Sequence, residues 1–200
     1  MTEFDAVILA NGVFPTAEAP LRFLHDAPFV VCCDGAARHW PQCDAVVGDG
    51  DSVPEALRER LIQIDEQEDN DLTKATRYCL SKGMKRIVYL GATGLREDHT
   101  IGNISLMARY AQEMEVTPLM ATDYGWFVVA EGECVFDSFK KQQVSIFNID
   151  CQSLASEGLR WNAYPYRQFW QGTLNEAVGR KFVLRGDGHY IVYRTYNPKA

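Results

Sequence analysis

The hydrophobic residues in the first part of the chain fall into short runs separated by segments with helical spacing. Four runs are apolar at nearly every position: 6–10, 29–33, 45–47 and 87–90. Such runs are typical of parallel strands that are buried on both faces. Between them, apolar residues recur at helical spacing in segments that begin at Ser52, at Asn70 or Asp71, and at Thr100. This alternation predicts an α/β fold with a doubly wound, mostly parallel sheet.

The pattern changes near Tyr124. The apolar runs that follow are short and have turns rather than helices between them: 126–129, 134–136, 144–147, 181–184 and 190–193. Gly186, Asp187 and Gly188 separate the last two runs and predict a hairpin there. These features predict a C-terminal antiparallel β-sandwich domain. We therefore divide the chain into an α/β domain at 1–125 and a β-sandwich domain at 126–200.

Bulk composition restricts the possible partners. The 200 residues carry a net charge of −7, and binding to a nucleic-acid backbone needs clustered Lys and Arg. The apolar runs are too short to span a membrane, and the first residues lack the basic start of a signal peptide. None of the six cysteines forms a C-x-x-C pair, so we expect buried free thiols rather than a zinc site. We expect a cytoplasmic protein that binds neither nucleic acid nor membrane.

Three acidic clusters lie in the first half of the chain, each after an apolar run or at a helix start: 48–52, 68–71 and 96–99. Carboxylates repel one another, so a fold that brings them together needs a cation. A hard divalent ion such as Mg²⁺, held jointly with substrate phosphates, fits such a set. The clusters therefore predict phosphoryl or pyrophosphoryl transfer, although each one alone is also consistent with a solvated turn or a helix cap.

Residues that directly follow the predicted strands are candidates, because ligands of open α/β sheets bind beyond the carboxyl ends of the strands. Asp34 and Gly35 follow the second apolar run. Asp49 and Asp51 follow the third run, and an extended segment points both side chains the same way. We expect these side chains to face the same cleft.

The helical segment after residue 69 has acids at its start. Negative side chains are favoured there by the helix dipole, which is sufficient to explain Glu68 and Asp69. Asp71, at the mouth of the helix, is better placed to reach inward. Lys74 could pair with an acid or contact a phosphate, but we expect an exposed helix residue that does neither.

The loop 91–94 consists of small residues between a predicted strand and a helix start. Its backbone N–H groups can therefore approach phosphate oxygens. Arg96 adds a planar donor group suited to phosphate, and Asp98 could hold a metal or orient Arg96. His99 is either a nucleotide contact or a capping residue, and Asn103, one turn on, is expected to face the same cleft.

In the second domain, Trp161 and Asn175 lie in segments that read as loops. An aromatic side chain with nearby amides suits a flat, cationic heterocycle. An equally good interpretation is that Trp161 and Trp170 form the core of a small sheet.

Taken in order along nearly the whole chain, these motifs resemble the thiamine pyrophosphokinase family. The matching stretches are Gly48-Asp49-Gly50-Asp51-Ser52, Asp71-Leu72 with Ala75, Gly94-Leu95-Arg96-Glu97-Asp98-His99, Gly102-Asn103 and Asn175-Glu176. The resemblance implies transfer of a pyrophosphoryl group from ATP to thiamine, giving thiamine diphosphate and AMP. It also implies an α/β domain followed by a β-sandwich, and a homodimer with sites between subunits.

The resemblance also implies roles for individual residues. Mg²⁺ would be held by Asp49, Asp51, Asp71 and Asp98. Catalysis would use Arg96 to neutralise charge and either Asp71 or Asp98 to accept the thiamine proton. ATP would be contacted by Asp34, Gly35, Asp49, Ser52, Asp69, Arg96, His99 and Asn103. Thiamine would be contacted by Trp161, Leu174 and Asn175.

Four positions depart from the family pattern. The family has a bulkier apolar residue at Gly50, a Gln at Asp69, a Gly at Leu95 and a Ser at Leu174. The metal carboxylates and Arg96 are retained. Two alternatives remain: a diphosphokinase that acts on a hydroxymethyl pterin, and a protein that binds nucleotide or thiamine without catalysis.

Overall fold

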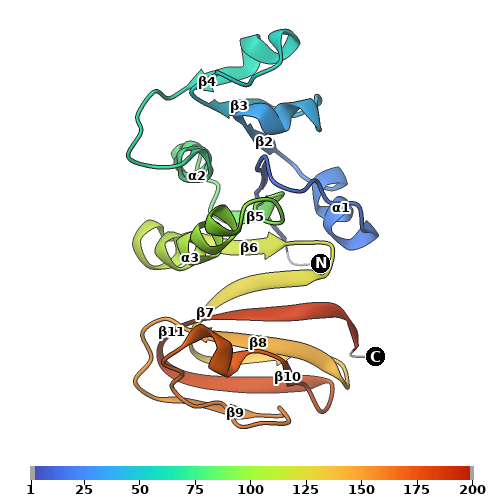
Figure 1. The fold of residues 1–200 in the computed structure, drawn as a ribbon, viewed down its shortest axis with the longest axis vertical. Coiled ribbons are helices and arrows are strands. Elements are labelled where there is room, and N and C mark those ends of the chain that lie inside the picture. The colour runs from blue at the N-terminus through green and yellow to red at the C-terminus, as the bar shows by residue number, and fades with distance from the viewer. Residues whose placement is uncertain (1–2, 199–200) are drawn as a thin grey trace. The chain divides into compact units, whose positions relative to one another are not determined.

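The structure is a computed structural model that describes residues 3–198. The chain forms two compact units, with the boundary between Asp123 and Tyr124. Figure 1 shows an N-terminal unit with helices and strands and a C-terminal unit built almost entirely from strands.

The N-terminal unit is built on one parallel sheet. Its strands are β1 (Ala6–Leu9), β2 (Val30–Cys33), β3 (Ala45–Gly48), β4 (Leu61–Gln63), β5 (Arg86–Leu90) and β6 (Thr117–Ala121). The strand order is β6-β5-β1-β2-β3-β4, and every pair is parallel. The parallel pairing confirms the predicted fold class. β1, β2 and β3 are buried at every position, as is typical of parallel strands covered on both faces.

The chain reverses direction across the sheet between β1 and β5. The first four strands run outward from β1 to one edge, and β5 then returns to the other side of β1. Loops that follow two such neighbouring strands diverge and leave a crevice at the carboxyl ends of the strands. The loops after Leu9 and Leu90 therefore mark where a ligand is expected.

The helices of this unit are α1 (Glu18–His25), α2 (Asp71–Ser81) and α3 (Glu97–Met114), with 3₁₀ turns η1 (Asp34–Arg38) and η2 (Glu55–Arg60). α2 begins as predicted, because the Asn70 side chain accepts a hydrogen bond from the Thr73 N–H. α3 begins at Glu97, three residues before the predicted start at Thr100. The helical segment predicted after Ser52 is instead the 3₁₀ turn η2, which ends where β4 begins at Leu61.

The C-terminal unit is an antiparallel β structure. Its elements are β7 (Gly125–Asp137), β8 (Gln142–Asn148), β9 (Leu154–Glu157), η3 (Phe169–Gly172), β10 (Asn175–Glu176) and β11 (Lys181–Pro198). The strands are ordered β10-β8-β11-β7, and β9 pairs with the first half of β11. Phe136, Ile146 and Phe182 belong to one buried core cluster of this unit. The predicted antiparallel arrangement is confirmed.

The predicted hairpin at 186–188 is wrong. Residues 181–198 form one long strand, β11, and the two runs predicted at 126–129 and 134–136 form one strand, β7. The pairing of β11 with β7 shifts register between Arg185 and His189, which is a β-bulge. Asp187 fixes the bulge by accepting hydrogen bonds from the N–H groups of Gln152 and Ser153, at 2.8 and 2.9 Å.

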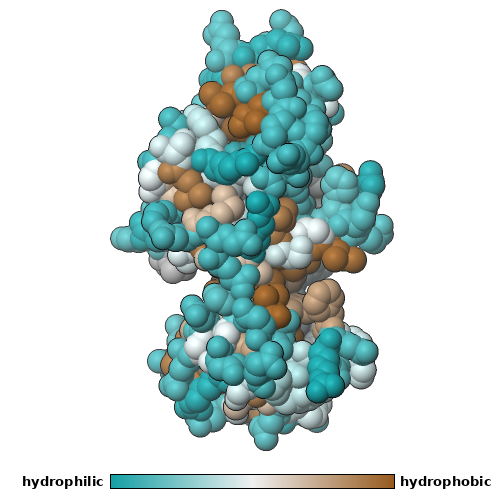
Figure 2. Space-filling model, turned by 90° about the vertical axis from the view of Figure 1, so that its left-hand side faces the viewer, coloured by the Kyte–Doolittle hydropathy of each residue, from teal (hydrophilic) through white to brown (hydrophobic). Residues whose placement is uncertain are grey.

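In residues 3–198, no helix combines the length and the apolar character needed to cross a membrane. The face drawn in Figure 2 is mainly hydrophilic, and its hydrophobic side chains occur in separate patches.

Candidate active site

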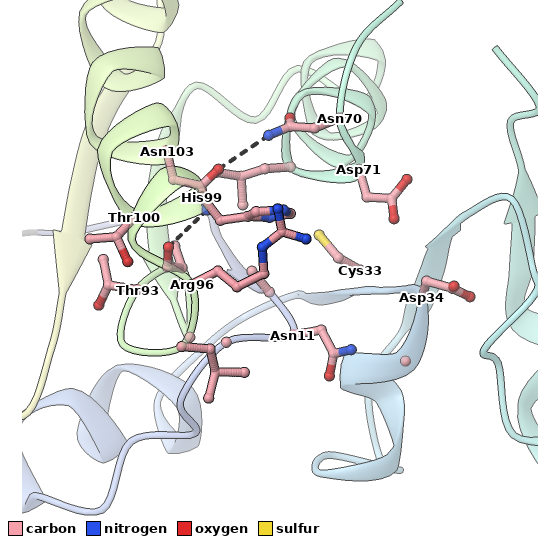
Figure 3. Close-up of a pocket in the computed structure, with 17 residues that line it drawn as sticks. Asn11, Cys33, Asp34, Asn70, Asp71, Thr93, Arg96, His99, Thr100 and Asn103 are labelled. Atoms are coloured by element: carbon pink, nitrogen blue, oxygen red, sulfur yellow. Dashed lines mark hydrogen bonds between the residues drawn. The ribbon is translucent and has the colours of Figure 1, made fainter. Parts of the chain in front are cut away.

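A cavity of about 380 Å³ lies at the carboxyl ends of the strands in the N-terminal unit. Its walls are the loops after β1, β2 and β5 and the first turns of α2 and α3. Polar lining residues include Asn11, Asp34, Asn70, Asp71, Thr93, Arg96, His99, Thr100 and Asn103. Figure 3 shows the Arg96 side chain reaching toward the middle of the cavity, with Asp71 and Asp34 beyond it. Of the residues predicted to contact ATP, the cavity brings together Asp34, Gly35, Arg96, His99 and Asn103.

Two loops of the cavity are tied together through their backbones. The Gly12 N–H donates to the Gly91 carbonyl at 2.7 Å, and the Val13 N–H donates to the Thr93 carbonyl at 2.9 Å. A Cβ on Gly12 would lie 2.3 Å from the Gly91 oxygen, so only glycine allows this approach. The loop 91–94 is thus held in one position at the switch point of the sheet.

Asn103 connects this loop to the start of α2. Its Nδ2 donates to the Ala92 carbonyl at 2.8 Å, and its Oδ1 accepts from Asn70 Nδ2 at 3.1 Å (Figure 3). Asn70 in turn caps α2 through Thr73. Asn103 is 8% exposed. Its amide therefore holds the loop and the N-terminus of α2 around one cavity.

Asp34 is a buried carboxylate with three acidic neighbours. Burial raises the pKa of Asp34, the N–H bond from Ser52 lowers it, and the charges of Asp49, Asp71 and Asp51 raise it further. The Ser52 N–H donates to Oδ2 at 3.2 Å. Oδ1 is buried and finds no hydrogen-bond partner within residues 3–198.

Asp49 and Asp51 do not line this cavity as far as the described residues show. They are nevertheless close enough to Asp34 to perturb its pKa. Gly48 allows this close approach of the chain before Asp49 to Asp34, because a Cβ at Gly48 would lie 2.8 Å from Asp34 Cβ. The acids after β2, β3 and the start of α2 therefore share one electrostatic environment.

Lys74 differs from the prediction. Instead of an exposed helix residue, it is 2% exposed and lies on the buried face of α2. Its Nζ lies 3.4 Å from Asp71 Oδ1. Asp71 itself is partly exposed at the cavity, so the pair links the interior of the unit to the cavity wall.

Arg96 and Asp98 form a bidentate ion pair on the surface. Arg96 Nε lies 3.1 Å from Asp98 Oδ1, and Nη2 lies 2.5 Å from Oδ2. The hydrogen bonds from Arg96 lower the pKa of Asp98, and the same pairing raises the pKa of Arg96. Asp98 also accepts a hydrogen bond from the His99 N–H. Of the two alternatives for Asp98, this geometry favours orientation of Arg96.

A second, shallower cavity of about 490 Å³ lies between α2 and α3, and Asp69, Asp98, His99 and Asn103 are among its lining residues. Asp69 stands where the family has Gln. It forms ion pairs with Arg77 Nη1 at 3.0 Å and Arg109 Nη1 at 2.7 Å. Both oxygens of Asp69 are thus engaged by arginines of the protein.

The family resemblance implies four carboxylate ligands for Mg²⁺: Asp49, Asp51, Asp71 and Asp98. Among residues 3–198, no group of three or more Asp, Glu, His and Cys side chains is arranged to hold a metal ion. The unpartnered Oδ1 of Asp34 and the neighbouring acids are nevertheless suited to a cation. Mg²⁺ needs only one or two carboxylates when phosphates supply other ligands.

The thiamine residues predicted in the C-terminal unit lie close together. Asn175 is buried, and its side chain accepts from the Trp161 N–H at 3.2 Å and donates to the Trp161 carbonyl at 2.7 Å. Trp161, Trp170 and Leu174 are exposed, so the tryptophans are not the core of a small sheet. The Arg160 guanidinium lies 4.9 Å from the Trp161 ring centroid in a cation–π contact.

Sequence reasoning did not select Asn11 and Cys33 as site residues, yet both line the first cavity. The signal that could have found them is their position, because they lie at the ends of β1 and β2, as Asp34 does. Their residue types gave no indication of a role.

An open parallel sheet with a polar cavity at its switch point, followed by an antiparallel β unit, is a two-domain architecture of the α/β class with a candidate active site. Two family models match this chain in the same order. The thiamin pyrophosphokinase catalytic domain matches residues 21–117, and the thiamin pyrophosphokinase substrate-binding domain matches residues 125–193. The chain belongs to the thiamin pyrophosphokinase family, and its function is that of a thiamine pyrophosphokinase.

Solved structures of the family have the same fold. The thiamine pyrophosphokinase of Bacillus subtilis is 18% identical, with 96% of this chain and 99% of that chain covered and a TM-score of 0.74. The enzyme of Candida albicans is 16% identical, with coverage of 97% and 90% and a TM-score of 0.78. The yeast enzyme is 14% identical, with coverage of 98% and 87% and a TM-score of 0.76. No curated protein matches the sequence.

Proposed function

We propose that the chain transfers the pyrophosphoryl group of ATP to the hydroxyethyl oxygen of thiamine and that the first cavity holds the ATP phosphates. The observation that carries this proposal is the cavity at the switch point, where Arg96, the loop 91–94 and Asp71 line one space. Backbone N–H groups and a guanidinium suit phosphate oxygens. The acids suit a cation that accompanies the phosphates.

The carboxylates proposed to hold Mg²⁺ are Asp34, Asp49, Asp51 and Asp71. The buried, unpartnered oxygen of Asp34 supports its inclusion. Asp98 is assigned to the orientation of Arg96 because both its oxygens already bond to that side chain. A bound Mg²⁺ would supply charge neutralisation on the phosphates.

In the proposed reaction, the thiamine oxygen attacks the β-phosphorus of ATP. A bond forms between them, the bond from the β-phosphorus to the α–β bridging oxygen breaks, and AMP leaves with that oxygen. Asp71 accepts the hydroxyl proton because it lines the first cavity, whereas Asp98 does not. Arg96 neutralises charge that develops on the phosphoryl oxygens. Positioning and electrostatics supply most of the rate in such transfers.

We propose that the exposed face of Trp161 binds the cationic ring of thiamine. Asn175 holds the backbone of Trp161 in place through its two hydrogen bonds. Leu174 stands where the family has Ser, and its N–H donates to the Ser145 hydroxyl at 3.2 Å. We further propose a homodimer, in keeping with the family. The six free thiols favour a cytoplasmic location, because disulfides are rare there.

The proposal is tested by incubating the purified protein with ATP, Mg²⁺ and thiamine and measuring thiamine diphosphate and AMP together. Equal amounts of both products are expected, with loss of both when EDTA is added. A parallel reaction with a hydroxymethyl pterin separates the two diphosphokinase activities. Binding of ATP and thiamine without AMP release would contradict the proposal and favour the non-catalytic alternative.

A further inference from the structure

Lys74 carries a charge, but it lies on a buried and largely apolar face of α2. α2 packs its buried face toward the strands, and the other buried residues on it are Leu72, Thr73, Ala75, Thr76 and Cys79. The Lys74 side chain is 3% exposed. An ammonium in such a position loses most of its hydration, so it is tolerated only with a compensating partner.

The partner is Asp71, one turn earlier on the same helix. Nζ lies 3.4 Å from Asp71 Oδ1, and the Asp71 side chain is 37% exposed. The two members of the pair are therefore buried to very different degrees. Lys74 is fixed inside the unit, while the carboxylate extends to the cavity that Asp71 lines.

Asp71 also has like-charged neighbours. Its charge and those of Asp49 and Asp51 all act on Asp34. Repulsion within such a group favours side-chain rotamers that point apart and away from the cavity. A cation on the protein side of Asp71 opposes that movement, because it attracts the carboxylate from a fixed point.

Lys74 does not line either of the two cavities among the described residues. Its amine is thus placed to act on Asp71 and not on a ligand in the cavity. We propose that Lys74 is a positioning residue that holds the Asp71 carboxylate toward the phosphate cavity. This inference rests on the proposed function, in which Asp71 takes part in the transfer.

The test is a double-mutant cycle with Lys74→Met, Asp71→Asn and the double variant. Methionine keeps the length and burial of the side chain and removes its charge. We expect Lys74→Met to lower kcat about 10- to 100-fold, with KM for ATP changed less than about 3-fold. In the Asp71→Asn background, the same substitution should change kcat less than about 3-fold, since Lys74 acts through Asp71.

Urea unfolding of the ligand-free variants provides a second readout that needs no activity. Asp71→Asn leaves a buried ammonium without its counter-charge, so it should lower the unfolding midpoint, and addition of Lys74→Met should restore it. Lys82→Met is the matched control, because Lys82 is exposed at the end of the same helix. It should leave kcat unchanged and shift the midpoint only slightly, through loss of the contact of Lys82 Nζ with the Tyr78 ring at 5.0 Å. If Lys74→Met does not fold, Lys74→Gln replaces it in both cycles.

Equal effects of Lys74→Met on kcat in both backgrounds would overturn the proposal, as would a fully active Lys74→Met. If the wild-type protein forms no thiamine diphosphate, the proposed function fails and the unfolding cycle decides the inference. Non-additive midpoints then support the anchoring of Asp71 by Lys74, and additive midpoints overturn it.

Discussion

The two units of the chain use their buried polar side chains differently. In the N-terminal unit, buried Asp34 and Asn103 line the cavity, and buried Lys74 pairs with a cavity residue. In the C-terminal unit, buried Gln142 and Asn175 hydrogen-bond to backbone groups of strands and loops. The first unit therefore concentrates charge at one end of its sheet, whereas the second uses amides to fix its backbone.

The surfaces of the two units also differ, in where large apolar side chains are exposed. Large apolar side chains are exposed over a short stretch of the C-terminal unit: Trp161, Tyr164, Phe169, Trp170, Leu174 and Val178. Exposed apolar groups close together are typical of surfaces that bind a ligand or a partner. The comparison supports the proposal that the first unit binds the phosphates and that the second unit recognises the aromatic substrate or a second subunit.

The largest effect is expected for Asp71→Ala. The substitution removes the proposed proton acceptor, so kcat should fall by about 10²–10⁴-fold. The protein should still fold, because Asp71 is partly exposed and the Asn70 cap of α2 is unaffected, although the loss of the Lys74 counter-charge should lower its unfolding midpoint. Steady-state kinetics and circular dichroism check the two statements together. A fully active Asp71→Ala protein would remove Asp71 from the mechanism.

The second prediction compares a glycine in each unit. A Cβ on Gly12 would lie 2.3 Å from the Gly91 oxygen, and one on Gly172 would lie 1.9 Å from the Ile146 oxygen. Each Gly→Ala change should destabilise the protein by about 1–3 kcal/mol, because the backbone must move apart. Gly12→Ala should raise KM mainly for ATP, and Gly172→Ala mainly for thiamine, each by about 10-fold.

Matched controls exist in both units. A Cβ on Gly102 in α3 or on Gly179 would meet no heavy atom within 4 Å. Gly102→Ala should stabilise the protein by up to about 1 kcal/mol, since alanine has the higher helix propensity. If each of Gly12→Ala and Gly172→Ala raises KM for ATP and KM for thiamine equally, the proposal that the two units bind different substrates is wrong.

The Asn175 side-chain amide holds the backbone of Trp161, which is proposed to contact thiamine. Asn175→Ala leaves the Trp161 N–H and carbonyl without the partners seen at 3.2 and 2.7 Å. Buried or half-buried backbone groups that lose a hydrogen bond cost about 1–3 kcal/mol. We expect a rise in KM for thiamine with little change in KM for ATP. Calorimetric binding of each ligand measures this split, and equal losses for both ligands would contradict it.

Much of the fold followed from local patterns. β1, β2 and β3 were predictable because a strand that is buried on both faces needs an unbroken apolar run. The start of α2 was predictable because Asn70 has the side chain of an N-cap. The bulge at Gly186 was not predictable, because Gly-Asp-Gly suits a bulge as well as a hairpin turn. The hydrogen bonds that favour the bulge join Asp187 to residues 152–153, which are distant in sequence.

The site was predictable in outline for a similar reason. Parallel strands end at one edge, so Asp34 and Arg96 could be expected near one another from sequence alone. The pairing of Asp69 with Arg109 could not, because the two lie 40 residues apart. Lys74 was assigned to the surface since lysine is rarely buried, and only the tertiary packing of α2 shows that it is covered.

The smallest effect is expected at the opposite end of the N-terminal sheet, at Asp5, directly before β1. Its carboxylate accepts hydrogen bonds from the Arg86 guanidinium at 2.8 and 3.1 Å and from the Arg86 and Lys85 N–H groups at 2.8 and 3.0 Å. These bonds, above all those of Arg86, lower the pKa of Asp5 from 3.8 to about 2. The stabilisation is therefore complete above about pH 4 and is lost as the pH falls through about 2.

Asp5→Asn should cost about 1 kcal/mol at pH 7, since solvent screens part of the interaction. The difference from the wild type should shrink between about pH 4 and pH 2, when the wild-type carboxylate also becomes neutral. Thermal unfolding across this range measures the difference, and kcat at pH 7 should be unchanged. Because β1 joins Asp5 to the cavity loop at its other end, an altered kcat would mean that the two ends of the sheet are coupled. An unchanged kcat with a lower melting temperature would separate stability at one end of the strands from chemistry at the other.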